Sequence, residues 1–341
     1  MPENLFGDDA PRPGLSLHII GVGGAGCNTL LRLRRHLSST VVMTALDTSQ
    51  DSLASCGAGI HTCLLANKRF GGRGAGDDAD GLALFLESEK SLPFEANPLG
   101  TDLIVLVGSL GGATGSATLP WLTQRLADTT DPTDDSTILL GFFIQPLAME
   151  SALAVDRSEQ TLEYLSHDLN SYMVVLNDRL ANTQPKGTFL EDAWYAADQT
   201  LVHLLDALSP KTTGTLEIDP GHILSFLRFG GQLHFGTGTG EGAKRVEESL
   251  EGAVKDGFLR PLRSPPHRAL VWVDGPGITT EEHKTMVESV AARLSPAPDG
   301  LTGSVRLAQR QKNGKMTLSL LLSPEAIPGA RLRGYQESYA S

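Results

Sequence analysis

The chain has 341 residues, 40% hydrophobic and 20% charged, which is the composition of a soluble globular protein long enough for two domains. A formal net charge of −12, with no block of Lys or Arg, argues against nucleic acid or an anionic membrane as a partner. The three cysteines are an odd number without a C-x-x-C pair, which argues against a disulfide framework and against a zinc site.

Residues 1–14 and 328–341 are polar, contain proline and glycine, and show no hydrophobic period, so we expect a tail at each end. The first tail has neither a basic n-region nor an apolar h-region. No apolar run approaches the roughly 18 residues that a membrane helix needs. We therefore expect a cytoplasmic protein that does not insert into a membrane.

Apolar runs rich in Val, Ile and Leu predict the first strands, at residues 15–22, 40–47, 101–108, 137–144 and 172–177. Continuous apolar runs are typical of strands that crossover helices bury on both faces. We therefore predict a doubly wound, mostly parallel α/β sheet in a nucleotide-binding domain over residues 15–190.

Apolar residues at helical spacing then predict one long amphipathic helix, and we assign residues 191–213 to this central helix and its end. A second, smaller α/β domain with a mixed sheet is expected over residues 214–327. Its predicted strands and helices are strands at 232–240, 267–275, 303–311 and 315–323, and helices at 242–258 and 279–294.

The turn GVGGAGCN follows the first predicted strand. Gly21, Gly23 and Gly26 fit the pattern G-x-G-x-x-G, and Asp47 ends the next apolar run about twenty residues later, the spacing of a dinucleotide fingerprint. Taken alone, this pattern predicts an NAD-binding Rossmann oxidoreductase.

Two further glycine-rich stretches change that interpretation: FGGRGAGDD at residues 70–78 and GSLGGATGSATLP at residues 108–120, before a helix expected to begin near Trp121. Glycines let backbone N–H groups approach a phosphate, and Thr114 and Ser116 add hydroxyl donors near a positive helix end. Three such turns at the carboxyl edges of neighbouring strands can surround a triphosphate, whereas a dinucleotide enzyme needs only one.

The segment GGATGS at residues 111–116 resembles the G-G-G-T-G-[ST]-G signature of the tubulin/FtsZ GTPase superfamily, with Ala113 and Ala117 at two glycine positions. The resemblance extends from about Leu15 to Ser323 and is closer to FtsZ than to eukaryotic tubulin. GVGGAGCN, LDTSQ and GGRGAG resemble the first three FtsZ nucleotide loops, and QPLAMES resembles the ribose-side loop. LNDRL and EDAWYAAD resemble the base-side segments, and TLEIDPGHI the loop that reaches into the neighbouring subunit.

The resemblance implies a site for GTP or GDP, with Mg²⁺ bound through the nucleotide phosphates. The residues it implies at the phosphates are Gly23, Gly24, Gly74, Ala75, Gly76, Gly111, Gly112, Ala113, Thr114, Gly115 and Ser116. Asn28 and Asp47, from the first and second loops, are also expected in the nucleotide site.

On the nucleoside side, the resemblance implies that Glu150 meets the ribose and that Asn177 and Trp194 hold and stack on the purine. Asp198 or Gln199 would face the guanine edge, and the family aspartate aligns with Gln199. A carboxylate accepts hydrogen bonds from both guanine N1–H and N2–H, which an amide does less well, so the guanine preference stays open.

FtsZ carries basic residues after the ribose-side glutamate, where this chain has Ala152, Leu153 and Ala154. A triphosphate with Mg²⁺ still favours a nearby cation. Arg73, in the third loop, is the candidate for that role, with Arg157 as a second candidate. The alternative for Arg73 is a solvated loop arginine.

Hydrolysis in this family depends on carboxylates of the inserted loop, which reads N-x-D-x-x-D. This chain has Glu217, Asp219 and His222 there, so one carboxylate position is a histidine. Carboxylates that orient a water lower the barrier by several kcal/mol, and we therefore predict that these three residues support only slow GTP hydrolysis. The alternative for His222 is that it simply begins a helix.

The resemblance thus implies a GTP-binding protein that polymerises head to tail into protofilaments, with itself and other FtsZ-type proteins as partners. Two alternatives stay open. The first is a structural or regulatory paralogue that binds GTP and does not hydrolyse it. The second is the NAD-binding oxidoreductase, which leaves two of the three glycine loops unexplained.

Overall fold

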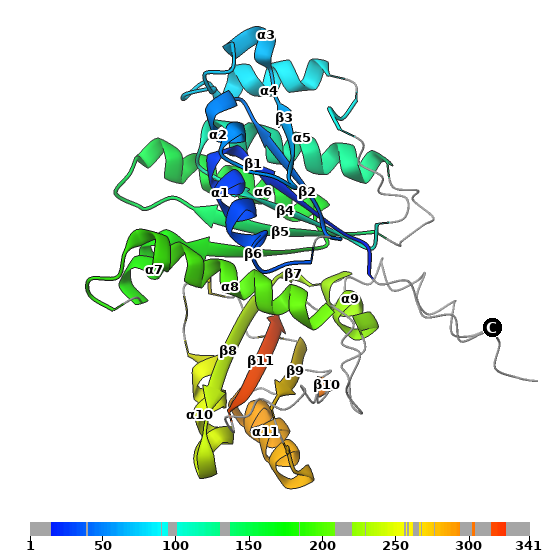
Figure 1. The fold of residues 1–341 in the computed structure, drawn as a ribbon, viewed down its shortest axis with the longest axis vertical. Coiled ribbons are helices and arrows are strands. Elements are labelled where there is room, and N and C mark those ends of the chain that lie inside the picture. Colours follow the sequence, from blue (N-terminus) through cyan, green and yellow to red (C-terminus); the bar gives the residue numbers. More distant parts are fainter. Residues whose placement is uncertain are drawn as a thin grey trace, which may run out of the picture.

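The computed structural model contains two β-sheets with a long helix, α8 (Leu190–Leu208), between them (Figure 1). It describes residues 15–38, 40–89, 91–94, 101–129, 137–183, 185–208, 220–228, 230–255, 257, 259–261, 266, 268–275, 277–293, 302–303 and 315–324. None of the helices in these ranges is long and apolar enough to cross a membrane.

The larger sheet has seven parallel strands in the order β3-β2-β1-β4-β5-β6-β7. These strands are β1 (Leu17–Val22), β2 (Val42–Asp47), β3 (His61–Leu64), β4 (Leu103–Ser109), β5 (Ile138–Gln145), β6 (Ser171–Leu176) and β7 (Gly231–Gln232). The helices along this part of the chain are α1 (Gly23–Leu33), α2 (Gln50–Ala54), α3 (Asn67–Phe70), α4 (Ala79–Ser88), α5 (Ala113–Thr129), α6 (Ala152–Asp168), α7 (Asn177–Thr183) and α9 (Pro220–Arg228).

The smaller sheet has four strands in the order β10-β9-β11-β8, in which β11 is antiparallel to both its neighbours and β10 is parallel to β9. Its elements are β8 (His234–Gly240), η1 (Gly242–Lys244), α10 (Arg245–Val254), β9 (Arg268–Asp274), α11 (Thr280–Arg293), β10 (Thr302–Gly303) and β11 (Met316–Ser323). The predicted fold class, a parallel α/β sheet with a second, mixed sheet, is confirmed. Of the strand predicted at residues 303–311, only the first residue lies within the described ranges.

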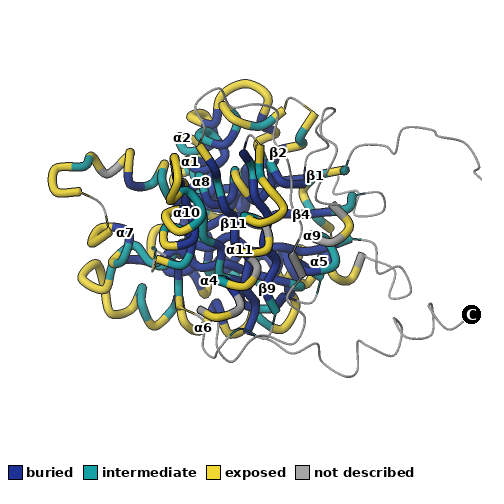
Figure 2. Tube along the Cα trace, turned by 90° about the horizontal axis from the view of Figure 1, so that it is seen from below, coloured by how far each residue is buried: buried dark blue, intermediate teal, exposed yellow. Residues whose placement is uncertain are grey.

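Successive strand residues enter opposite layers of the core, as expected for strands covered on both faces. Ile19 of β1 packs in a cluster with α1, α8 and α9, whereas the next residue, Ile20, packs in a cluster with α4, α5 and α6. Figure 2 shows the buried residues running through the centre along the strands and the exposed residues on the outer helices. The five apolar runs of the first half are therefore strands, as predicted.

Helix α8 is the layer shared by the two sheets. Leu201, Leu204 and Leu205 belong to the same buried cluster as Phe235 and Trp272 of the smaller sheet. The other face of the smaller sheet packs on α10 and α11. A long apolar stripe on α8 was predicted from its sequence, and two sheets flanking the helix explain why the stripe is wide.

One local prediction was wrong and one strand was missed. Helix α5 begins at Ala113 rather than near Trp121, so Pro120 lies inside the helix and residues of the glycine signature form its first turn. Strand β3 was not predicted, because His61 and Thr62 are exposed and the strand lacks a continuous apolar run. The stretch FGGRGAGDD therefore follows β3 and α3.

His18 is a buried histidine of β1, 6% exposed, whose Nε2 lies 2.9 Å from the Thr44 hydroxyl of β2. Burial, and to a smaller extent the nearby His61, lowers the pKa of His18 from 6.5 to about 4. The imidazole therefore stays neutral in the folded protein over a pH range in which it is charged in the unfolded chain.

We expect acid to destabilise the fold through His18. Since the unfolded chain binds the extra proton below about pH 6.5 and the folded protein only near pH 4, stability falls as the pH falls through this window. The total loss is about 3 kcal/mol, of which about 2 kcal/mol falls between pH 7 and about pH 5. Urea unfolding of wild type and His18→Gln at these two pH values measures the effect.

The variant His18→Gln should lose about 2 kcal/mol less stability on acidification than the wild type, because its side chain does not titrate. His167→Gln, at an exposed position of α6, serves as the control and should keep the wild-type pH dependence. Equal losses in wild type and His18→Gln would contradict the assignment.

Candidate nucleotide-binding site

Four loops meet at the carboxyl edge of the larger sheet, where parallel strands end side by side. We define loop 1 as residues 21–25 at the end of β1, and loop 2 as residues 47–50 at the end of β2. Loop 3 is residues 71–76, beyond β3, and loop 4 is residues 109–116 at the end of β4. Because β3, β2, β1 and β4 are neighbours in the sheet, the four loops lie in one row.

Direct contacts join these loops into one structure. The Thr48 hydroxyl lies 2.9 Å from that of Thr114, which links loops 2 and 4. Gly74 N–H donates to the Thr48 carbonyl at 3.0 Å, and Gln50 N–H donates to the Gly72 carbonyl at 2.8 Å, which links loops 2 and 3. A Cβ on Gly23 would lie 3.5 Å from Cβ of Thr114, so loop 1 also contacts loop 4. The predicted turns therefore converge on one place.

Two helices begin at this place and direct their positive ends towards it. Helix α1 begins at Gly23, whose φ of 70° suits only glycine well, and no side chain caps this end at Val22. Helix α5 begins at Ala113, within loop 4. First-turn N–H groups have no partner inside their own helix, so both helix starts favour an anion.

Gly112 and Gly115 of loop 4 differ in what surrounds them. A Cβ on Gly112 would meet nothing within 4 Å, so its backbone borders open space. A Cβ on Gly115 would lie 1.9 Å from the Ser109 carbonyl oxygen, so this position has no room for a side chain. The backbone at residue 112 thus faces open space, whereas glycine at residue 115 allows loop 4 to close on itself.

In loop 3, two of the three predicted phosphate donors are already bonded within the protein. Gly74 N–H donates to the Thr48 carbonyl at 3.0 Å, and Ala75 N–H donates to the Thr48 hydroxyl at 2.9 Å. The N–H of Gly76 has no partner among the described residues. Loop 3 therefore offers one free amide of the three that the sequence suggested.

Asp47 is buried at the start of loop 2 and is hydrogen-bonded within that loop. Its side chain is 3% exposed and accepts a hydrogen bond from Ser49 N–H at 3.1 Å, while burial raises the pKa of its carboxyl. The carboxylate is thus bonded within loop 2, and its expected place in the nucleotide site stays a prediction. Asn28, by contrast, lies on the exposed face of α1.

On the nucleoside side, Trp194 of α8 is half-buried, and the Arg32 guanidinium of α1 lies 5.9 Å from its ring centroid. Arg32 also pairs with Asp198, through its Nε to Oδ2 and through its Nη2 to Oδ1 at 3.3 Å. Burial raises the pKa of Asp198, and its bonds to Arg32 oppose that rise. Of the two candidates for the guanine edge, Asp198 thus already has a cationic partner.

Sequence reasoning did not find Arg32. An arginine in the last turn of an amphipathic helix is most often solvated, and its partner lies 166 residues away. Only the packing of α1 against α8 reveals the pair.

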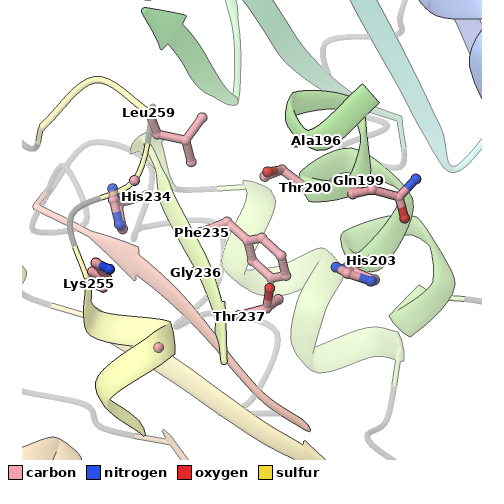
Figure 3. A pocket seen from close by; sticks show the side chains of 12 residues that line it. Ala196, Gln199, Thr200, His203, His234, Phe235, Gly236, Thr237, Lys255 and Leu259 are labelled. Atoms are coloured by element: carbon pink, nitrogen blue, oxygen red, sulfur yellow. The ribbon is translucent and has the colours of Figure 1, made fainter. Parts of the chain in front are cut away.

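The remaining nucleoside-side residues lie on three different elements. Glu150 is exposed after β5 and accepts a hydrogen bond from Leu147 N–H at 3.2 Å. Asn177 begins α7, and its Oδ1 is buried without a partner among the described residues. Gln199 of α8 lines a cavity of about 160 Å³ between α8 and β8, where His203 and Phe235 lie on facing sides (Figure 3).

A model of the GTPase domain of the Tubulin/FtsZ family matches residues 16–185, which contain all four loops. The chain belongs to this family. The cell division protein FtsZ 1 of Pyrococcus horikoshii is 27% identical over 291 residues, covering 84% of this chain and 75% of that protein.

Solved structures of the family share the fold. An empty FtsZ dimer from M. jannaschii is similar with a TM-score of 0.72 and 21% identity, over 92% of this chain and 89% of that one. A GTPγS-bound protofilament of CetZ2 from Haloferax volcanii is similar with a TM-score of 0.71 and 21% identity, over 96% of this chain and all of that one. The resemblance to the tubulin/FtsZ superfamily is therefore confirmed.

Ala113 and Ala117, which replace glycines of the family signature, are both buried and do not line the exposed side of loop 4. Ala113 is 5% exposed and Ala117 is 8% exposed, and both pack in the cluster beneath α5. Their methyl groups therefore pack into the core and do not cover the open backbone of Gly112.

The two candidate cations differ in their surroundings. Arg73 is exposed and makes no ion pair or side-chain hydrogen bond within the described ranges, although its backbone pairs with Ser49 in an isolated bridge. Arg157 of α6 is half-buried, and its Nη1 donates to the Gly111 carbonyl at 3.3 Å. Arg157 thus lies at loop 4, one helical turn beyond Ala154, the last of the three apolar residues at which the resemblance places basic residues.

The predicted hydrolytic residues are not placed. Glu217 and Asp219 lie outside the described residues. His222 lies in α9, consistent with the alternative that it belongs to a helix start, but its side chain is outside the description.

Proposed function

We propose that this protein binds GTP and GDP at the four loops and assembles head to tail into filaments. The observation that carries the proposal is the convergence of the loops, together with the starts of α1 and α5 and the open backbone of Gly112 in loop 4. Backbone amides and helix ends of this kind suit a polyphosphate, and Mg²⁺ would bind through the phosphates. Residues implied by the family at the ribose and base, among them Glu150 and Trp194, lie on the neighbouring elements β5–α6 and α8.

Assembly is supported by exposed apolar side chains beside the ribose-side residue. Met149 is 87% exposed and Leu153 is 60% exposed, and they flank Glu150 in the chain. These two side chains lie beside the proposed ribose contact, where a second copy of the chain would cover them. The proposed partner is a second copy, whose segment with Glu217 and Asp219 would complete the site; other FtsZ-type proteins are a second class of partner.

The proposed division has a nucleotide domain over residues 15–190, a central helix over residues 191–213 and a second domain over residues 214–327. The cavity between α8 and β8 gives these parts room to shift, so a movement of the smaller sheet against α8 is the proposed switch. We place the protein in the cytoplasm.

The proposal is tested by identifying the nucleotide released from denatured protein and by sedimentation with GTP or GDP. GDP or GTP in the extract, with more pelleted protein in GTP, is the expected result. Equal amounts of sedimented protein in GTP and in GDP would favour a structural or regulatory paralogue. NAD in the extract would overturn the proposal, although the buried carboxylate of Asp47 already argues against a ribose contact of the dinucleotide type.

We expect slow hydrolysis because the inserted segment carries a histidine at a family carboxylate position, and the variant His222→Asp should raise the turnover at least about tenfold. Phosphate release in Mg²⁺ and GTP measures it, with His167→Asp on the exposed face of α6 as the control. A wild-type turnover as fast as that of an efficient FtsZ would contradict the prediction.

A further inference from the structure

Thr48 lies among the four loops and is buried from solvent. It follows β2 in loop 2, and its exposed fraction is 0%. Two of its neighbours in the loops are Ala75, which is 6% exposed, and Thr114, which is half-buried. A side chain so placed does not touch a ligand, and its effect on one must pass through these neighbours.

Three bonds connect Thr48 to two other loops. Its carbonyl accepts from Gly74 N–H at 3.0 Å, its hydroxyl accepts from Ala75 N–H at 2.9 Å, and the same hydroxyl lies 2.9 Å from that of Thr114. The hydroxyl oxygen is thus the one side-chain atom that bonds to both loop 3 and loop 4 among the described residues. Loops 3 and 4 reach the site from different strands, and this atom fixes the distance between them.

Removing the hydroxyl leaves both neighbours without that partner. Ala75 N–H is buried, and a buried donor without an acceptor is costly, so loop 3 would turn to find another acceptor. Thr114 would lose the bond that holds its side chain against loop 2. Both changes alter the place where a phosphate would bind, while the base-side residues on α8 stay where they are.

We propose that Thr48 is a positioning residue of the polyphosphate site, whose hydroxyl holds loops 3 and 4 in the arrangement that receives the phosphates. The inference rests on the proposed function of the loops. It assigns to a residue that touches no ligand a specific effect on the phosphate part of the nucleotide.

The test compares guanosine, GDP and GTP by calorimetric titration of wild type, Thr48→Val and Thr48→Ser, each first freed of nucleotide. Valine keeps the shape and removes the hydroxyl, whereas serine keeps the hydroxyl. Thr48→Val should bind GDP and GTP about tenfold more weakly, the size of one lost hydrogen bond, with guanosine affinity unchanged. Thr48→Ser should stay within about twofold of the wild type.

The matched control is Thr44→Val, since Thr44 is a buried threonine of β2, the strand that leads into loop 2, and its hydroxyl bonds to His18 instead of the loops. It should lower the unfolding midpoint and leave GDP affinity unchanged. Equal loss of guanosine and GDP affinity in Thr48→Val would show a general structural defect and overturn the inference, as would wild-type GDP affinity in that variant.

If Thr48→Val does not fold, Thr48→Cys replaces it, because a thiol is a weak hydrogen-bonding group of similar size. Thr48→Cys should then bind GDP more weakly than the wild type does, by a smaller factor, with guanosine affinity unchanged. An unchanged GDP affinity would overturn the inference. Failure of the wild type to bind any guanine nucleotide would instead overturn the proposed function, and the inference with it.

Discussion

Replacing Gly112 with alanine is expected to weaken GDP and GTP binding about a hundredfold while the protein folds as the wild type does. A Cβ at this position meets nothing within 4 Å, so the variant gains no clash. The methyl group would occupy the open side of loop 4 and keep a phosphate from the backbone amides. Loss of two charge-assisted hydrogen bonds of about 1.5 kcal/mol each accounts for the expected factor.

Two further glycine variants separate this effect from a loss of fold. Gly257→Ala also enters open space but lies outside the four loops, so it should bind GDP normally. Gly115→Ala places a methyl group 1.9 Å from the Ser109 carbonyl oxygen and should not fold stably. Titration with GDP and thermal unfolding measure the three variants. Wild-type GDP affinity in Gly112→Ala would show that the phosphates do not bind at loop 4.

Replacing Arg32 with alanine is expected to lower the free energy of unfolding by about 3–5 kcal/mol. The side chain of Asp198 is 3% exposed, so without Arg32 its charge would be buried and unpaired. Urea unfolding at about pH 7 measures the loss. The variant should also recover stability as the pH falls, because the unpaired carboxyl of the folded state then binds a proton more readily than that of the unfolded chain.

The double variant Arg32→Ala/Asp198→Asn should recover part of the lost stability, since no charge is left unpaired. Lys284→Ala is the control, because Lys284 and Glu288 are 3.7 Å apart and both largely exposed. An exposed pair contributes at most about 1 kcal/mol. If Arg32→Ala destabilised the protein no more than Lys284→Ala, the pair would not be a structural element of the α1–α8 contact.

The fold was predictable wherever a local sequence pattern follows from the burial of the element. Continuous apolar runs predicted β1, β2, β4, β5 and β6, because a strand covered on both faces needs apolar residues at every position. Strand β3 escaped because it lies at the sheet edge with two exposed residues. The start of α5 was misplaced because its first turn has the glycine-rich composition of a loop, and glycine is a poor helix former, although the helix begins at Ala113.

The candidate site was predictable to the level of loops but not of individual donors. Three glycine-rich turns after parallel strands indicated a polyphosphate site, and the structure brings these turns together. Nothing local shows that Ala75 N–H already donates to Thr48, or that Asp198 pairs with Arg32. Whether a donor is free for a ligand depends on which groups of the other segments lie beside it in the folded chain.

The sequence by itself determined the layered parallel sheet, the long helix between two sheets and the glycine turns at one sheet edge, because each follows from the chemistry of neighbouring residues. Only the tertiary structure decided which polar groups remain free for a ligand. The other polar groups have partners as many as 166 residues away, as in the pair of Arg32 and Asp198. A hydrogen bond needs its two atoms about 3 Å apart, and the order and twist of the strands set that distance.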